Sequence, residues 1–262
     1  MTLMSHVSSD NAPQWDVLRP ALGYLAAITA AELLTTFWQP QFGLLFHGVL
    51  LVVLLVHVTF RWEKASRDVL LSLSFAPLIR LMSLSLPLVG IPLVYWYFIT
   101  SVPLFVSVLI TARRLHFSPS ELGLNLRNLH LQVPVIFLGL GFGYMEYYIL
   151  RPKPLAAAFT WEAIWLPALI LLVSTGFAEE VIFRGLMQQA ATPVLGWTSH
   201  IYVSAIFAVL HVGYRSLTDV LFVFGVAMVF AMIVRRTGSI VGVSLAHGLT
   251  NIVLFLVAPF VH

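Results

Sequence analysis

The sequence predicts an all-α fold: a polytopic helical membrane protein with eight to nine transmembrane helices around a polar intramembrane cavity. Of its 262 residues, 60% are hydrophobic and 10% are charged, whereas a soluble domain carries roughly 25% charged residues. Most of the surface must therefore face something other than water. Helices follow because backbone groups inside lipid must form their hydrogen bonds within the spanning segment. Ionisable residues inside three apolar segments of the last third predict the polar cavity.

Apolar runs of about 20 residues are needed to cross the ~30 Å hydrocarbon core of a bilayer. The candidate runs cover about 21–38, 42–60, 68–88, 92–112, 133–150, 162–188, 198–213, 219–235 and 239–258. Two of them, 198–213 and 219–235, are short for a span, and Pro77, Pro87 and Pro92 interrupt the third region. We favour nine spans, with eight as the close alternative, in one continuous membrane domain.

One long hydrophilic connection, 113–131, separates the first four runs from the rest. It contains leucines among polar residues, at positions Leu122, Leu124, Leu126, Leu129 and Leu131. This mixture is typical of a segment that lies along the membrane surface.

The basic residues predict the orientation, because cytoplasmic loops carry an excess of lysine and arginine. With nine spans and a cytoplasmic N-terminus, nine of the 14 basic residues fall inside, three fall outside, and Arg80 and Arg184 lie within spans. The inside set is Arg19, Arg61, Lys64, Arg67, Arg113, Arg114, Arg127, Arg235 and Arg236, and the outside set is Arg151, Lys153 and Arg215. This asymmetry favours a cytoplasmic N-terminus and a C-terminus outside. We expect an integral, multi-pass protein, and we assign it to a prokaryotic plasma membrane.

Two further features narrow the class of protein. The segment from Met1 to Arg19 is polar and mixed in charge, so we expect no cleavable signal peptide. Cysteine is absent, which excludes disulfides, thiol catalysis and cysteine-ligated metal.

The first polar motif is Glu179-Glu180-Val181-Ile182-Phe183-Arg184. An ionisable residue at bilayer depth is a candidate functional residue because its burial costs several kcal/mol. Glu180 and Arg184 are four residues apart and can pair along one helical turn, which leaves Glu179 unpaired, ~100° round the axis. We interpret Glu179 as a general base that polarises water, with Glu180 and Arg184 as its structural support. The alternative is a buried ion-pair cluster that only packs helices.

The other two motifs supply imidazoles and an amide. His211 ends the segment Phe207-Ala208-Val209-Leu210-His211, and on its own it is equally consistent with a hydrogen bond to a neighbouring helix. His247 and Asn251 lie four apart on one helical face, where both could donate to a developing oxyanion. A polar clamp between helices is the alternative. Gly176, Gly185 and Gly248 nearby would allow close helix approach.

The predicted spans conflict in depth. In straight helices, Glu179 lies ~25 Å along its span, whereas His211 lies near the outer end of the next one. We therefore expect a broken helix, a linker between Gln189 and Trp197 that enters the membrane, or a misplaced span boundary.

Polar residues elsewhere in the spans have simpler interpretations. Glu32 and Arg80 are predicted to pair between the first and third spans. His47 and His57 lie ten apart and on nearly opposite faces of one helix, which argues against a metal site. Glu146 is interpreted as a solvated residue at a helix end, with the lining of a substrate entrance as the alternative.

The order EExxxR, FxxxH and HxxxN resembles the CAAX protease and bacteriocin-processing (CPBP) family of intramembrane endopeptidases, related to the Ras-converting prenyl-protein proteases. The resemblance covers roughly 113–258, including Glu121-Leu122-Gly123-Leu124 and the Phe183-Arg184-Gly185 end of the first motif.

The resemblance implies that Glu179 and His211 activate water, that His247 and Asn251 form the oxyanion site, and that Glu180 and Arg184 support the glutamate. Residues 113–258 would then be the catalytic helical core. Residues 1–112 add spans in which we identify no chemistry.

Two versions of the reaction remain open. In the favoured version no metal takes part and Glu179 activates the water. In the other version Glu179, His211 and His247 bind Zn2+, which generates hydroxide. The HExxH pattern that marks many zinc proteases is missing.

The resemblance implies an intramembrane endopeptidase that cleaves near the end of a membrane-associated protein or peptide, on the cytoplasmic side. We expect contact with the lipid bilayer and no nucleic-acid partner. The alternative from another class is a non-catalytic immunity, scaffold or transport protein that uses the polar groups as an ion site. The matching halves that many transporters contain are not visible in the sequence.

Overall fold

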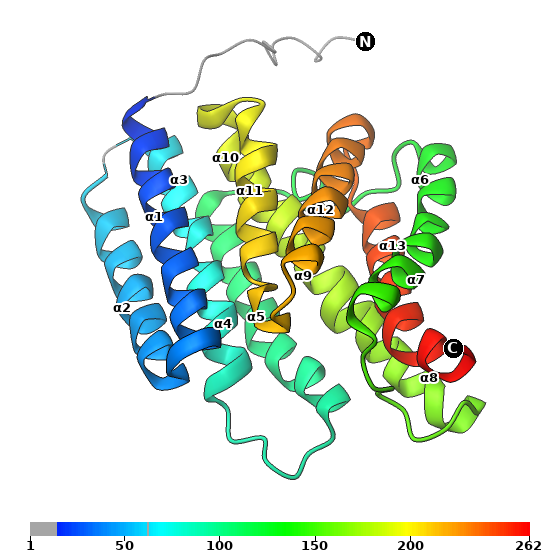
Figure 1. Cartoon of the computed structure of the whole chain (residues 1–262). Helices are drawn as coiled ribbons and strands as arrows, with labels where there is room; N and C mark the ends of the chain where they lie inside the picture. The colour runs from blue at the N-terminus through cyan, green and yellow to red at the C-terminus, as the bar shows by residue number, and fades with distance from the viewer. Residues whose placement is uncertain (1–14, 62) are drawn as a thin grey trace.

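A computed structural model describes residues 15–61 and 63–262, and within these residues all regular structure is helical. In chain order the elements are α1 (Trp15–Leu33), η1 (Leu34–Trp38), α2 (Pro40–Thr59), α3 (Lys64–Leu73), α4 (Phe75–Ser85), α5 (Leu93–Leu115), α6 (Leu129–Ile136), α7 (Leu138–Leu150), α8 (Trp161–Ile170), η2 (Leu171–Phe177), α9 (Ala178–Glu180), η3 (Val181–Met187), α10 (Gln188–Leu195), α11 (Thr198–Val209), η4 (Val212–Tyr214), α12 (Leu217–Thr237), α13 (Val241–Ile252), η5 (Val253–Val257) and α14 (Ala258–Val261). The predicted all-α class is confirmed. Figure 1 shows the helices side by side in alternating directions.

Eight continuous helices in the described residues are long and apolar enough to cross a membrane. They are Trp15–Trp38, Pro40–Thr59, Lys64–Ser85, Leu93–Leu115, Leu129–Leu150, Trp161–Leu195, Leu217–Thr237 and Val241–Val261. The protein is therefore an integral, multi-pass membrane protein. Eight lies within the predicted range of eight to nine spans. The run 198–213, counted as a span in the prediction of nine, contains α11, which has 12 residues and is only about 18 Å long.

Exposed apolar side chains on α2 are consistent with contact to lipid. Phe42, Leu45, Val49 and Val52 recur at helical spacing, and each is at least 45% exposed. In water such a stripe would mark a binding surface. In a helix that is long enough to cross a bilayer, it is the surface that the hydrocarbon core covers.

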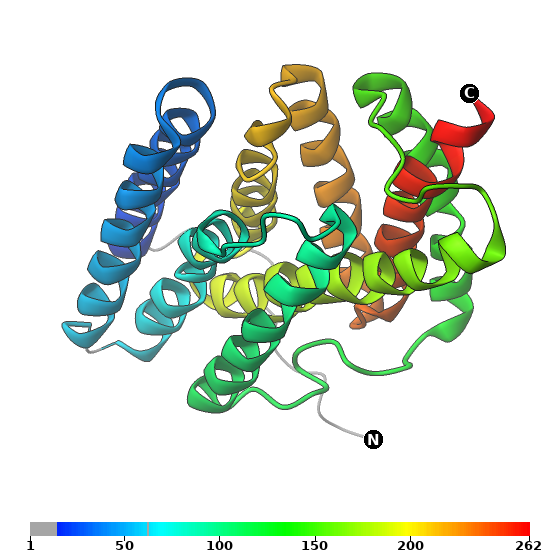
Figure 2. The ribbon, with the colours of Figure 1, turned by 90° about the horizontal axis from the view of Figure 1, so that it is seen from below.

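The helix from Trp161 to Leu195 crosses the molecule obliquely and carries the first polar motif. It has 35 residues, which at 1.5 Å per residue is about 50 Å, longer than the hydrocarbon core is thick. Figures 1 and 2 both show it tilted across the bundle, from α8 at one edge to α10 near α11. Two π-helical stretches, η2 and η3, flank the short α9 that holds Glu179 and Glu180. Such π-bulges inside α-helices often occur at functional sites.

The short α11 removes the conflict in depth between Glu179 and His211. Because α11 ends at Val209, the turn that carries His211 does not reach the outer end of a full-length span. The polypeptide reverses there through η4 into α12, which packs along α11 (Figure 1). The predicted boundary of 162–188 was also too early, because the long helix continues to Leu195 and Glu179 therefore lies near its middle.

The predicted surface segment 113–131, which includes the connection between α5 and α6, is only partly exposed. Leu126, Leu129 and Leu131 are exposed, as expected. Leu122, in contrast, is buried, and its carbonyl oxygen lies only 2.8 Å from where a Cβ on Gly185 would stand. The Ile240 amide also donates to the Gly123 carbonyl (3.0 Å), so the connection is fixed to the turn between α12 and α13.

The predicted pair between Glu32 of α1 and Arg80 of α4 is confirmed. The Arg80 Nε donates to Glu32 Oε1 at 2.7 Å, and the Glu32 side chain is fully buried. His47 of α2 lies beside the same carboxylate, with His47 Nε2 3.3 Å from Glu32 Oε1. His57 instead contacts Tyr24 and Arg61, so the two histidines of α2 belong to separate contacts, as their spacing predicted.

Gly176 of η2 and Gly248 of α13 let the two helices that carry the polar motifs approach closely. A Cβ on Gly176 would stand 2.5 Å from the Gly248 backbone nitrogen and 2.7 Å from the Ser244 carbonyl oxygen. Backbone atoms cannot move aside as a flexible side chain can, so only glycine fits at this crossing.

Gly176→Ala should therefore destabilise the protein by about 1–3 kcal/mol, the usual cost of overpacking. The measurement is reversible unfolding of the purified protein in detergent. Gly225→Ala is the matched control, since a Cβ on Gly225 of α12 meets nothing within 4 Å and alanine favours a helix. Equal stability of both variants would contradict the close crossing.

Candidate active site

Glu180 lies at the centre of the polar cluster. Its Oε1 atom accepts hydrogen bonds from Arg184 Nη1 and from His247 Nδ1, both at 2.9 Å. The predicted pair with Arg184 is confirmed, and the bond from His247 is an addition that spacing did not predict. Glu180 therefore links η3 to α13 through one fully buried oxygen.

Glu179 is the more accessible of the two glutamates, with 31% of its side chain exposed. Its Oε2 atom lies 3.9 Å from His247 Nε2. This separation is too long for a hydrogen bond, but it is suitable for a bridging water. As its position in the motif predicted, Glu179 is not the partner of Arg184; among the described residues its ion-pair neighbour is His247.

Arg184 holds three helices together around the glutamates. Besides Glu180, it donates from Nη2 to the Ala227 carbonyl of α12 at 3.2 Å. Its guanidinium carbon also lies 4.7 Å from the centre of the Phe207 ring of α11. The planar guanidinium suits this combination of hydrogen bonding and stacking better than a lysine ammonium would.

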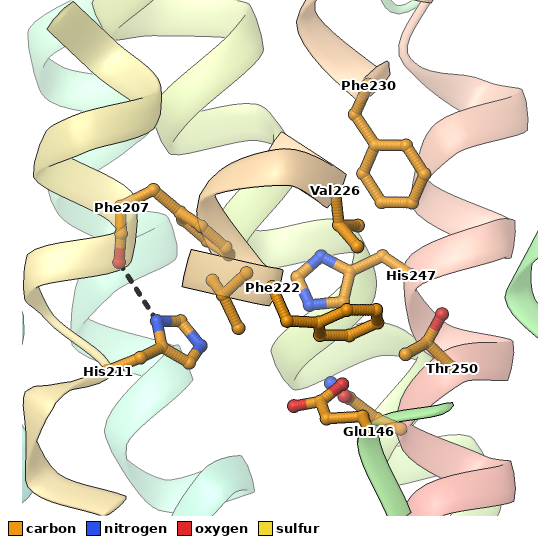
Figure 3. A pocket seen from close by; sticks show the side chains of 10 residues that line it. Glu146, Phe207, His211, Phe222, Val226, Phe230, His247 and Thr250 are labelled. Atoms are coloured by element: carbon orange, nitrogen blue, oxygen red, sulfur yellow. Dashed lines mark hydrogen bonds between the residues drawn. The ribbon is translucent and has the colours of Figure 1, made fainter. Parts of the chain in front are cut away.

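His211 follows the end of α11 and is oriented by its own helix. Its Nδ1 lies 2.9 Å from the Phe207 carbonyl oxygen, which can only accept, so Nδ1 carries the hydrogen. In the neutral ring, Nε2 is then a free acceptor. The dashed line in Figure 3 marks this bond, with the ring of His211 on the same side of the cavity as Phe207.

Asn251 is held on the face of α13 that also carries His247. Its Nδ2 donates to Thr175 Oγ1 at 2.8 Å, and Thr175 in turn donates to the Leu171 carbonyl. One amide hydrogen of Asn251 remains to donate elsewhere. Sequence reasoning missed Thr175, although its position four residues before Glu179 on the same helix was a usable signal.

His211, His247 and Asn251 line one small cavity between α7, α11, α12 and α13 (Figure 3). The volume open to the centres of water molecules is about 30 Å3, enough for water. The remaining lining residues are Glu146, Phe207, Phe222, Val223, Val226, Phe230 and Thr250. Glu179 does not line this cavity, but it lies beside one of the lining residues, His247.

The interpretation of Glu146 as a solvated helix end was wrong. Only 7% of this residue is exposed, and its carboxylate is directed to the cavity below His247 (Figure 3). The rule used for the other motifs is that an acidic residue inside an apolar run is a candidate functional residue, and this rule would have selected Glu146. We assigned Glu146 to the membrane interface instead because tyrosines surround it in the sequence.

The suggested zinc ligands do not form a metal-binding cluster. Among residues 15–61 and 63–262, no three histidine, cysteine, aspartate or glutamate side chains are placed to hold one metal ion. Glu179 and His247 are neighbours, and the Phe207 ring packs against both imidazoles, 4.8 Å from the His211 ring and 5.9 Å from the His247 ring.

Comparison with known families places the site in a segment that matches a protease family. Residues 160–253 match the model of the type II CAAX prenyl endopeptidase Rce1-like family. This segment is similar to an Rce1-like domain. The resemblance inferred from the three motifs is thereby confirmed, and it is consistent with the CAAX protease and bacteriocin-processing family.

The matched segment contains all six predicted site residues, which lie between Glu179 and Asn251. This similarity supports an intramembrane CAAX-type endopeptidase in general, with a membrane-embedded protein substrate and a lipid bilayer as its surroundings. Neither the curated proteins nor the solved structures contain a match to the chain.

Proposed function

We propose that the protein hydrolyses a peptide bond near the end of a membrane-associated protein or peptide, using water activated by Glu179. The observation that carries this proposal is the arrangement around His247. Its Nδ1 is fixed by the buried Glu180–Arg184 pair, its Nε2 is directed toward Glu179, and its ring lines the cavity with His211 and Asn251.

In the proposed reaction, Glu179 accepts a proton from water while the water oxygen bonds to the carbonyl carbon of the substrate. His211 orients this water through Nε2. The oxyanion that forms accepts hydrogen bonds from His247 Nε2 and from the free amide hydrogen of Asn251. The carbon–nitrogen bond then breaks, and the leaving nitrogen takes the proton from Glu179, which restores the carboxylate.

Charge balance in the cluster supports a protonated His247 in this role. Glu179 and Glu180 carry two negative charges, and Arg184 carries one positive charge. A doubly protonated His247 balances the formal charges of Glu179, Glu180 and Arg184 and gives Nε2 a hydrogen to donate; Glu146, on the cavity wall, is outside this count. Neutral clusters are favoured where burial makes an unpaired charge expensive.

The wall of the cavity supports an apolar substrate segment. Phe222, Val226 and Phe230 of α12 form this wall opposite α13 (Figure 3). The family's name specifies a prenyl endopeptidase, so a lipid-modified C-terminal segment is the first substrate to test.

The orientation that we propose places the start of α1 in the cytoplasm of a prokaryotic cell. Most of the basic residues lie in the connections α2–α3, α5–α6 and α12–α13 or in the helix ends next to them, and these connections lie on the side where α1 begins (Figure 1). An excess of basic residues on one side is typical of the cytoplasmic side.

The direct test uses purified protein in lipid nanodiscs and two quenched fluorescent peptides. One peptide ends in a farnesylated cysteine followed by three residues, and the other is identical but unprenylated. Cleavage of either peptide by the wild type, with loss in Glu179→Gln, supports the proposal. Equal cleavage by the wild type and Glu179→Gln contradicts the proposal. If neither peptide is cleaved, membranes from cells that lack the protein are searched for a precursor that accumulates, and the absence of such a precursor also contradicts the proposal.

Asn251→Ala should lower kcat by about 100- to 1000-fold with a small change in KM, as loss of one oxyanion donor does in other hydrolases. Asn125→Ala is the control, because the Asn125 amide donates to Gly238 outside the cavity and should leave kcat unchanged. An Asn251→Ala enzyme with normal kcat would remove this residue from the oxyanion site.

We further propose that no metal ion takes part in this hydrolysis. Dialysis against a chelator that binds Zn2+ tightly should then leave the activity unchanged, and the purified active protein should contain much less than one zinc per chain. Loss of activity on chelation, with recovery when Zn2+ is added back, would establish the zinc version instead.

A further inference from the structure

The residues that link the N-terminal helices to the His211 turn form a second polar cluster. Arg80 of α4 donates from Nε to Glu32 (2.7 Å) and from Nη2 to the Leu210 carbonyl (2.6 Å). Leu210 directly precedes His211. A single guanidinium, with only 14% of its side chain exposed, therefore connects α1 and α4 to the backbone beside a proposed site residue.

Two further bonds hold the same part of the protein. Arg215, at the other end of the turn, donates to the Thr36 carbonyl of η1 at 2.5 Å. Tyr202 of α11 donates to the Ala21 carbonyl of α1 at 2.8 Å. The turn between α11 and α12 is therefore held to the N-terminal helices on both sides of His211.

Helix termini explain why an arginine is suited to this place. The last carbonyls of a helix have no partner within it, and a positive charge near them is favourable. Leu210 is the C-cap of α11. The Arg80 guanidinium satisfies its carbonyl, and Glu32 compensates the charge. His47 closes the cluster from α2, 3.3 Å from the same Glu32 oxygen.

We propose that Arg80 is a positioning residue, which fixes the backbone at Leu210 so that His211 Nε2 stays directed into the cavity. The hydrogen bond to the Phe207 carbonyl already fixes the His211 ring. Movement of the backbone at Leu210 and His211 is then the remaining motion that would turn Nε2 away from the cavity. The N-terminal helices, in which the sequence showed no chemistry, thus take part in the reaction through this bond. The inference rests on the proposed function, in which His211 orients the water.

The test compares Arg80→Gln, Glu32→Gln and the double variant. Arg80→Gln should lower kcat by about 10- to 100-fold with KM within about twofold, the usual effect when a supporting hydrogen bond is lost or a reacting group is slightly displaced. Glu32→Gln should keep most of kcat, because Arg80 still reaches Leu210, although its melting temperature should fall. Arg61→Gln is the control, since Arg61 bonds to His57 and not to the turn.

The double variant separates positioning from simple charge pairing. Removing both charges leaves no unpaired buried ion, so its melting temperature should exceed that of Arg80→Gln. Its kcat should stay as low as that of Arg80→Gln, because the bond to Leu210 is still missing. Recovery of kcat together with stability would overturn the proposal.

A measurement that needs no substrate uses 15N spectra of the histidine rings, with His211→Gln to assign the signal. Wild type and Glu32→Gln should give one sharp His211 pattern with hydrogen on Nδ1, and Arg80→Gln should give a broadened or shifted pattern. An unchanged His211 signal in Arg80→Gln overturns the positioning role. An active Glu179→Gln enzyme would refute the proposed function instead, which keeps the two failures distinct.

Discussion

Replacing Glu179 with glutamine is expected to reduce kcat by about 100- to 10,000-fold, the range that a general base contributes. Glutamine has nearly the same shape but cannot take a proton from water. The unfolding free energy should change little, because Glu179 forms no hydrogen bond within the described residues and is 31% exposed. The measurement is the initial rate of peptide cleavage in nanodiscs, with melting temperatures recorded in parallel.

Glu162→Gln is the matched control for this prediction. Glu162 lies in the first turn of α8, on the same long helix, and is exposed. Its substitution should leave both kcat and stability unchanged. Comparable losses of activity in the two variants would show that general changes of charge on this helix matter, rather than a base at position 179.

Arg184→Gln is expected to destabilise the protein by about 3–5 kcal/mol, the usual result when one partner of a buried ion pair is removed. The substitution leaves Glu180 without its cation and takes away the bond to Ala227 and the stacking on Phe207. Activity should fall as well, since His247 is oriented through Glu180. Chemical unfolding in detergent and the cleavage assay measure the two effects.

Lys64→Gln provides the comparison for a pair with one exposed partner. Lys64 and Asp68 are also four residues apart, and Asp68 is buried, but the lysine side chain is 57% exposed. Solvent screens the lysine charge, so its removal should cost about 1 kcal/mol or less. If Arg184→Gln cost no more than Lys64→Gln, the buried pair would not be the structural centre of the site.

The membrane fold was predictable because apolar runs of span length leave few alternatives to helices. The count of spans was not, because it depended on α11. Its sequence is as apolar as that of its neighbours. The helix nevertheless ends at Val209, where the backbone reverses direction, and the local sequence does not mark this reversal. Tertiary packing against α12 decides where this helix stops.

The pairing of Glu180 with Arg184 was predictable from helical geometry, since both lie on one helix four residues apart. The bond between Glu180 and His247 was not, because these residues are 67 positions apart. It depends on the close crossing at Gly176 and Gly248. Periodicity shows which residues share a face, but it does not show which faces meet.

Glu146 and Arg80 show where the interpretation of single residues failed. Glu146 was assigned to the membrane interface from its aromatic neighbours, and it proved to be buried beside His247. Arg80 was correctly paired with Glu32. Its second bond, to the Leu210 carbonyl, joins residues that are 130 positions apart in the sequence, so periodicity could not predict it. Both residues satisfied the general rule that buried charge in a membrane helix has a function.

The central claim is that the carboxylate of Glu179 activates a water molecule that cleaves a peptide bond. Cleavage of the farnesylated peptide in water enriched in 18O, followed by mass spectrometry, tests it most directly. The account predicts that the wild type places one 18O atom in the new carboxyl group, while Glu179→Gln forms almost no product. Labelled product from Glu179→Gln at the wild-type rate would contradict it.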